Sequence, residues 1–166
     1  MLSFSAFSQN PLIGKNLPNL TLKGDDGGRL DGSEWTLEQS LKENKVTVIF
    51  YADPDEKDKN EDISERFLEK KYPLDKVQFL GMINMEATWL PNFAISEALK
   101  SKQRKYPDTL YLKDYTKKAI GVWKIADDEN NVIVLDQSGK VVFAKFGYVT
   151  KEEGDKLLAL IDGLIK

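Results

Sequence analysis

The sequence VTVIFYA at residues 46–52 decides the fold of this chain. These residues are β-branched or aromatic and almost continuously apolar, a pattern typical of a strand that is covered on both faces of a sheet. We therefore predict a central strand over 46–52. The whole chain has 166 residues, of which 41% are hydrophobic and 31% charged, as expected for one folded globular domain.

The segment that follows this strand predicts a strand–helix–strand unit. Residues 53–55 end the strand, and Ile63, Phe67 and Leu68 recur at helical spacing before Pro73. A further strand is predicted over 77–83. A helical connection of this length favours parallel pairing of the two strands.

The segment before the central strand reads as an extension. Leu20 and Leu22 alternate with polar residues, which predicts a short strand. Residues 24–32 hold four glycines and three aspartates and are predicted to form a turn. Thr36 with Gln39 three residues later is a capping-box pattern, and it predicts a short helix as far as about residue 43.

The C-terminal third predicts a hairpin and a closing helix. Apolar strands at 132–135 and 141–144 flank the turn sequence Asp-Gln-Ser-Gly at 136–139. Thr150 and Glu153 form a second capping-box pattern, which predicts that a final helix begins there. One face of that helix carries Leu157, Ile161, Leu164 and Ile165.

Residues 84–128 lie between the strand–helix–strand unit and the hairpin, and we predict that they form an insertion. Residues 91–103 look helical, whereas 109–112 and 120–123 look like short extended pieces.

This order of elements resembles the thioredoxin fold. The motif Gly14-Lys-x-Leu-Pro-x-Leu-x-Leu22 resembles the opening of peroxiredoxin-like domains, and residues 134–141 resemble their hairpin. The C-terminal half carries Trp123 with the acidic run after it, residues 132–141, Ala144-Lys145 and residues 150–153. With these features it resembles the YtfJ-like family of exported bacterial thioredoxin-fold proteins of unknown function.

The resemblance implies a three-layer α/β fold, in which helices flank a central mixed sheet, with an N-terminal extension and an insertion. It covers residues 11–166 as one domain and leaves 1–10 as a tail or the remnant of an export signal.

The composition excludes the chemistry for which this fold is known. The chain has no cysteine and no histidine, so thiol–disulfide exchange and thiol peroxidase activity are excluded. A redox-active relative would carry Cys-x-x-Cys after the central strand, where this chain has Asp55, Glu56, Lys57 and Asp58. The cis-proline of such relatives would fall near residues 130–131, which are both asparagine.

Acidic side chains gather in two runs that the fold would bring together. The candidate ligands for Ca²⁺ or Mg²⁺ are Asp53, Asp55, Asp58, Asp127, Asp128 and Glu129. An EF-hand loop starting at Asp53 would need glycine at Asp58 and glutamate at Ser64, so that motif fails. The competing interpretation, which we favour, is that the first run stabilises a helix N-terminus. Paired carboxylates also suit a hydrolase that cleaves glycosidic bonds.

Aromatic residues concentrate around the insertion and are a candidate partner surface, formed by Trp89, Phe93, Tyr111 and Trp123. The alternative is that they pack the insertion onto the sheet. Lys100, Lys102, Arg104 and Lys105 form a basic patch that we interpret as a solvated helix face.

The remaining features concern compartment and partners. Residues 2–8 are apolar or small, and Ala6-Phe7-Ser8 has the form of a signal-peptidase site, so we expect a periplasmic or secreted protein, with a cytoplasmic location as the alternative. A net charge of −3 without a basic block argues against nucleic acid as a partner. No apolar run approaches the ~20 residues of a membrane-spanning helix.

We expect a binding or protein-interaction module rather than an enzyme. A divalent-metal binding protein or hydrolase is the alternative. The sequence specifies neither the partner nor the oligomeric state.

Overall fold

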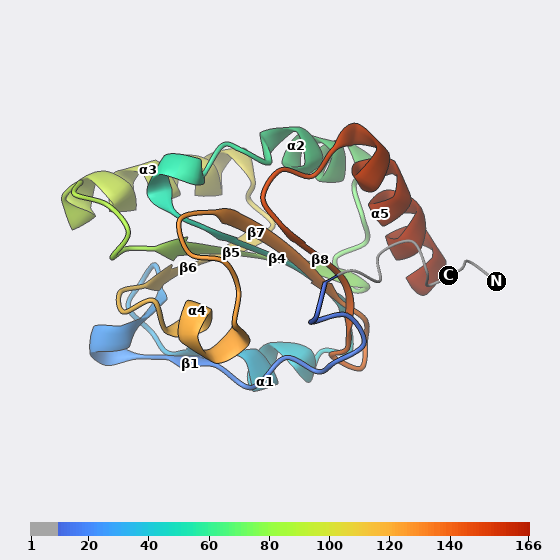
Figure 1. The fold of residues 1–166 in the computed structure, drawn as a ribbon, viewed down its shortest axis with the longest axis horizontal. Helices are drawn as coiled ribbons and strands as arrows, with labels where there is room; N and C mark the ends of the chain where they lie inside the picture. Colours follow the sequence, from blue (N-terminus) through green and yellow to red (C-terminus); the bar gives the residue numbers. More distant parts are fainter. Residues whose placement is uncertain (1–9) are drawn as a thin grey trace.

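The computed structural model describes residues 10–166 and is built around one mixed sheet (Figure 1). The strands are β1 Thr21–Leu22, β2 Gly27–Arg29, β3 Trp35–Thr36, β4 Val46–Ala52, β5 Val77–Asn84, β6 Thr109–Asp114, β7 Asn130–Leu135 and β8 Val141–Phe146. The helices are α1 Leu37–Leu41, α2 Glu61–Lys70, α3 Asn92–Lys105, α4 Lys118–Trp123 and α5 Lys151–Leu164. The predicted signal remnant at residues 2–8 lies outside the described residues.

The central position of β4 is confirmed. The six-stranded sheet has the order β2-β6-β5-β4-β7-β8, so β4 has a hydrogen-bonded neighbour on each side. It pairs in parallel with β5, as predicted, and antiparallel with β7. Six of its seven residues are buried, and the seventh, Phe50, is partly buried. A strand that is buried on both faces and paired on both edges explains the nearly unbroken apolar sequence.

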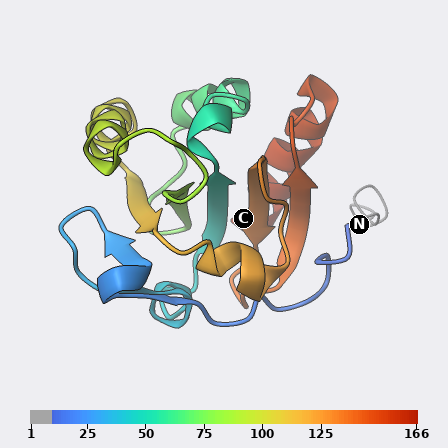
Figure 2. The same cartoon turned by 60° about the vertical axis from the view of Figure 1, so that its left-hand side comes forward.

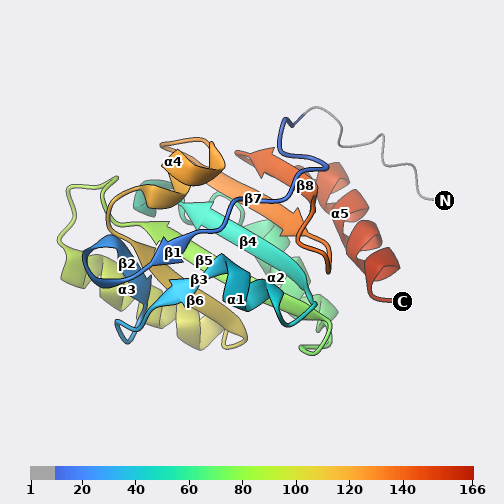
Figure 3. The same ribbon diagram turned by 90° about the horizontal axis from the view of Figure 1, so that it is seen from below.

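Helices cover both faces of the sheet, which gives the predicted three layers. Helices α2, α3 and α5 lie on one face (Figures 1 and 2). Helices α1 and α4 and the N-terminal extension with β1 and β3 lie on the other (Figure 3). Along β4, Val46 and Val48 pack in the core below α2 and α5, whereas Ile49 and Tyr51 pack in the core on the α1 and α4 side. Within residues 10–166, no helix is both long enough and apolar enough to cross a membrane.

The prediction that residues 24–32 form only a turn is wrong. Residues 27–29 form strand β2, which pairs antiparallel with β6 at the edge of the central sheet. Gly27 and Gly28 have φ angles of 127° and 140°, which side chains other than glycine rarely adopt. A Cβ atom on Gly27 would lie 2.0 Å from the carbonyl oxygen of Lys113. The glycines therefore permit close approach of two backbones as well as turning the chain.

The prediction that residues 120–123 are extended is also wrong, because they belong to helix α4. The Asp114 carboxylate, at the end of β6, accepts hydrogen bonds from the backbone N–H groups of Lys118 at 3.0 Å and Ala119 at 2.9 Å. Ala119 and Trp123, one helical turn apart, point into the core and are 0% and 1% exposed. The carboxylate of Asp114, just before the helix, thus caps a helix too short to show periodicity in the sequence.

The other predicted elements are confirmed, with small shifts of their ends. The insertion supplies α3 and β6, and β6 extends the sheet by pairing in parallel with β5. Strands β7 and β8 form the hairpin. Thr36 accepts the N–H of Gln39 at the start of α1, and both hydrogen bonds of the capping box between Thr150 and Glu153 are present at the start of α5.

The Asp114 carboxylate generates the first prediction. It also accepts a hydrogen bond from the Tyr51 hydroxyl at 3.1 Å, and its residue is fully buried. We expect Asp114→Ala to lower the free energy of unfolding by about 2–4 kcal/mol, because it leaves buried donors without an acceptor and removes a helix cap. Tyr51→Phe removes one of those donors and should cost only about 1 kcal/mol. Urea denaturation of both variants checks this; equal losses would contradict the capping role of Asp114.

Candidate functional site

The two acidic runs meet at the C-terminal end of β4. The antiparallel register of β4 and β7 places Ala52 opposite Asn130. Immediately beyond, the Asp53 N–H donates to the carbonyl oxygen of Glu129 at 3.1 Å. The side chain of Asn130 donates to the carbonyl oxygen of Glu56 at 2.9 Å. The predicted proximity of the two runs is therefore confirmed.

Residues 55–58, which the sequence resemblance aligned with a redox motif, do not begin a helix as expected. Pro54–Glu56 form a single 3-10 turn, and α2 begins only at Glu61. The acidic residues in the first turn of α2 are therefore Glu61 and Asp62, and not Asp55 or Asp58. The segment from Asp55 to Asp58 lies in the connection between β4 and α2, at the C-terminal end of the central strand.

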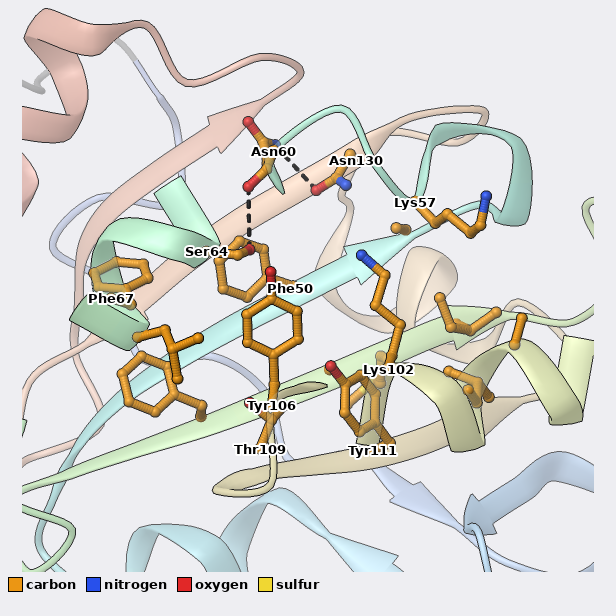
Figure 4. A pocket seen from close by; sticks show the side chains of 18 of the residues that line it. Phe50, Lys57, Asn60, Ser64, Phe67, Lys102, Tyr106, Thr109, Tyr111 and Asn130 are labelled. Carbon is orange, nitrogen blue, oxygen red and sulfur yellow. Dashed lines mark hydrogen bonds between the residues drawn. The ribbon is translucent and has the colours of Figure 1, made fainter. Parts of the chain in front are cut away.

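Two buried asparagines, Asn60 and Asn130, link the segment before α2 to β7 and to the end of β8. Asn60 donates through Nδ2 to Asn130 Oδ1 at 3.0 Å and to the carbonyl oxygen of Gly147 at 3.1 Å (Figure 4). Its own Oδ1 accepts the N–H of Val149 at 2.8 Å. Sequence analysis did not identify Asn60, because an asparagine before a helix looks like any other helix cap. Its partners are 70 and more residues away.

Three aspartates converge beside this network, and we call them the Asp53 cluster: Asp53, Asp127 and Asp128. One carboxylate oxygen from each lies within 4.8 Å of the others. Asp53 is only 3% exposed, whereas Asp127 and Asp128 are exposed. Asp53 Oδ1 accepts a hydrogen bond from Asn84 Nδ2 at 2.9 Å, and the enclosed Oδ2 has no hydrogen-bond partner in the part of the chain that the structure describes. Lys117 Nζ lies 3.0 Å from Asp127 Oδ2.

The environment of Asp53 disfavours its ionised form. Burial is the largest cause and raises the pKa of the carboxyl to about 6, with the negative charges of Asp127 and Asp128 acting in the same direction. The hydrogen bond from Asn84 and the charge of Lys117 oppose this rise. At neutral pH the chain thus maintains a buried carboxylate at the expense of folding stability.

The other predicted ligands lie outside this cluster. Asp58 is in ion pairs with Lys57 at 3.0 Å and Lys102 at 3.1 Å. Glu129 is in an ion pair with Lys59. Asp55 is exposed and lines a groove on the neighbouring face of the sheet. Of the six predicted ligands, three come together, and two of the other three, Asp58 and Glu129, have cationic partners.

That groove, which we call the α2–α3 groove, lies between those two helices and over β4, β5 and β6 (Figure 4). Its volume is about 710 Å³. Aromatic rings line it: Phe50, Phe67, Tyr72, Phe79, Tyr106 and Tyr111. The Phe67 ring centroid is 5.4 Å from that of Phe79 and 6.2 Å from that of Phe50, so these rings form one surface.

Small residues shape the lining of the α2–α3 groove. Gly81 occupies the middle of β5 on the groove face, and a Cβ atom there would lie 2.7 Å from Cε1 of Tyr111, so the glycine makes room for the Tyr111 ring. The α3 wall presents Ala94 and Ala98, one turn apart. Leu68, predicted to face the core, is 43% exposed and lines the opposite wall. The sequence contained these residues, but their alignment around one space depends on tertiary packing.

A cluster of charges joins α2 to α3 at the groove. Glu61, at the start of α2, accepts hydrogen bonds from Lys102, Lys105 and the Tyr106 hydroxyl of α3 and its C-terminus. Although burial opposes it, these bonds lower the pKa of Glu61 to about 2. Lys105 is exposed, as predicted, whereas Lys102 is partly buried, so the interpretation as a solvated face is wrong for Lys102. Both lysines pair with Glu61.

Of the four residues of the predicted partner surface, only two have exposed side chains. Trp89 and Phe93 are 88% and 74% exposed. Tyr111 is 8% exposed and lines the groove. Trp123 is 1% exposed, and its indole N–H donates to the carbonyl oxygen of Pro18 at 2.9 Å. The assignment of Trp123 to a surface is wrong, because this residue anchors the N-terminal extension to α4.

Known proteins match this chain in sequence and in fold. A family described as bacterial protein of unknown function (YtfJ_HI0045) matches residues 22–164. The uncharacterized protein YtfJ of Escherichia coli (strain K12) is 27% identical over 134 residues, which are 80% of this chain and 72% of YtfJ.

Solved structures resemble it at low identity. A hypothetical protein from Sinorhizobium meliloti 1021 superposes with a TM-score of 0.69 at 14% identity, covering 94% of this chain and 85% of that one. A putative thiol:disulfide interchange protein DsbE from Chlorobium tepidum superposes with a TM-score of 0.61 at 14% identity, covering 93% and 98%. These likenesses show the thioredoxin-like fold.

The second prediction concerns Asp53. The pKa of Asp53 in the folded protein lies above the ordinary value of 3.8. The protonated carboxyl therefore adds to the free energy of unfolding below about pH 4, and this contribution is lost as the pH rises through about 6. In chelator-treated protein, Asp53→Asn should raise the free energy of unfolding by about 1–3 kcal/mol near pH 8 and change it little near pH 4. Asp55→Asn, at an exposed neighbour, is the control. Denaturation at both pH values checks this; a destabilised Asp53→Asn near pH 8 would contradict it.

Proposed function

This chain belongs to the YtfJ_HI0045 family of bacterial proteins of unknown function, and we propose that it is a non-redox binding protein that holds an apolar small molecule in the α2–α3 groove. The observation that carries the proposal is the groove itself. Its volume of about 710 Å³ lies in the range of ligand sites, which is about 300–1,000 Å³.

The chemistry of the lining supports an apolar ligand. Aromatic rings from β4, β5, β6 and α2 supply a continuous apolar surface, and burying a ligand against it gains free energy in proportion to the apolar area removed from water. Three lysines line the groove: Lys57, Lys71 and Lys102. Lys102 is in ion pairs with Asp58 and Glu61, and Lys57 is in an ion pair with Asp58, so two of the three charges are already paired.

Polar side chains gather at one end of the groove, beside the loop at residues 55–58. Asn60, Ser64 and Asn130 line that end, and Lys71, Asp108 and Thr109 add polar groups elsewhere in the lining. The Ser64 hydroxyl donates to the carbonyl oxygen of Asn60 at 3.1 Å, which leaves its own oxygen able to accept (Figure 4). A ligand with an apolar body and one polar, hydrogen-bonding end would match this distribution.

Binding in this groove would not require redox chemistry. The resemblance to redox-active thioredoxin folds places their cysteine motif at Asp55, Glu56, Lys57 and Asp58, and two of these residues, Asp55 and Lys57, line the end of the groove. None of these side chains can exchange a disulfide, but they contribute to the wall of a recognition site. The scaffold would then serve ligand binding alone.

The third prediction tests the groove with the neutral fluorescent probe N-phenylnaphthylamine. Ala98 is exposed on the groove wall, so Ala98→Trp should fill the groove without disturbing the core. We expect it to weaken probe binding about tenfold or more, which corresponds to ~1.4 kcal/mol. Ser101→Trp, at an exposed position of α3 outside the lining, is the matched control. Probe binding that survives Ala98→Trp, or that the wild type lacks, would exclude the groove as an apolar site.

We also propose export to the periplasm or to the exterior. The support is the sequence pattern at residues 2–8, with Ala6-Phe7-Ser8 placed before Gln9 as a signal peptidase would require. The fourth prediction is that the protein is released from its native bacterium by osmotic shock or found in the medium, with a processed N-terminus at Gln9 by mass spectrometry. An intact N-terminus in the cytosolic fraction would contradict export.

A further inference from the structure

We propose that the Asp53 cluster is a binding site for one Ca²⁺ ion, a property that goes beyond ligand binding in the α2–α3 groove. The donor set is of the kind that hard cations require. Three carboxylates, from the end of β4 and from the loop between α4 and β7, bring oxygens within 4.8 Å of one another. Oxygen ligands without nitrogen or sulfur favour Ca²⁺, Mg²⁺ or Mn²⁺ over the softer transition metals.

An enclosed oxygen without a partner points independently to a ligand. Asp53 is only 3% exposed, and its Oδ2 makes no hydrogen bond with any of residues 10–166. Buried carboxylate oxygens normally have a partner, because desolvating one without compensation is unfavourable. A cation at the cluster would supply that partner. The hydrogen bond from Asn84 to Oδ1 orients the carboxylate, as the outer partners of metal ligands commonly do.

The spacing is compatible with Ca²⁺. Two oxygens on opposite sides of Ca²⁺ are about 4.6–5.2 Å apart, since each Ca–O bond is roughly 2.3–2.6 Å. Oxygens that lie within 4.8 Å of one another fall inside that span. Asp127 and Asp128 lie on an exposed loop, which leaves room for water to complete the coordination shell.

Lys117 distinguishes this cluster from the other acidic groups. Its ammonium pairs with Asp127 alone, so three carboxylates share one cation. Asp58 and Glu61, by contrast, share Lys102, and Glu61 has Lys105 as well. The Asp53 cluster therefore retains negative charge, and Lys117 would compete with a bound ion for Asp127.

The experiment is calorimetric titration of chelator-treated protein with CaCl₂. We expect one site with a dissociation constant on the order of 10⁻⁴–10⁻³ M, as for Ca²⁺ sites with few protein ligands. Asp53→Asn should weaken it about tenfold or more, since it removes a charged ligand. Asp55→Asn should leave it unchanged. Because Asp53→Asn is expected to be more stable than the wild type, its loss of binding would not reflect unfolding.

Lys117→Gln provides a test with the opposite sign. Removing the competing ammonium should tighten Ca²⁺ binding about two- to fivefold, the scale of an exposed ion pair. A passive structural cluster predicts no such gain. Ala98→Trp, which fills the groove, should bind Ca²⁺ like the wild type. The experiments therefore test Ca²⁺ binding at the Asp53 cluster independently of ligand binding in the α2–α3 groove.

Location is checked by nuclear magnetic resonance with Mn²⁺ as a paramagnetic substitute. Amide signals of residues 52–54 and 126–129 should broaden first. The proposal is overturned if chelator-treated protein shows no saturable Ca²⁺ binding at millimolar concentrations. It is equally overturned if Asp53→Asn retains wild-type affinity, or if the broadening centres on Asp58 and Glu61.

Discussion

Strand β4 is the constraint on which the rest of this structure depends. It is hydrogen-bonded to β5 on one edge and to β7 on the other, and helices cover both of its faces. A strand in that position has no side left for solvent, so its sequence must be apolar throughout and its end must be terminated by polar residues. The chain leaves β4 at Asp53, and the second acidic run returns beside it at Glu129. Both candidate sites are arranged around this point.

The edge where redox-active thioredoxin folds carry their cysteines is held differently here. Amide side chains of Asn60 and Asn130 link the loop before α2 to β7 and to the end of β8. These bonds are buried, so breaking one would leave unsatisfied polar groups in the interior. The result is a rigid junction. It carries no nucleophile, but it holds a carboxylate in an environment that raises the pKa of Asp53 to about 6.

Two kinds of recognition thus lie next to each other. The Asp53 cluster offers negative charge and an enclosed oxygen, whereas the α2–α3 groove offers aromatic surface. The turn Pro54–Glu56 separates them, since Asp53 belongs to the cluster and Pro54 and Asp55 line the groove. A buried carboxylate that costs stability, and an apolar groove that remains unfilled, are both features that folding alone does not favour.

The sequence by itself determined the strands and helices whose signals are local: the apolar run of β4, the amphipathic α5 with its capping box, and the β7–β8 hairpin. It also determined that thiol chemistry is excluded, because that conclusion needs only composition. Tertiary structure decided the rest. Strand β2 exists because Gly27 can approach Lys113, and the groove exists because α2 and α3 pack on the same face of the sheet. Asp114, which caps α4 locally, is held in the core by the hydroxyl of Tyr51, 63 residues away. In each case a partner is remote in the chain, and a local pattern carries no information about a contact that only folding creates.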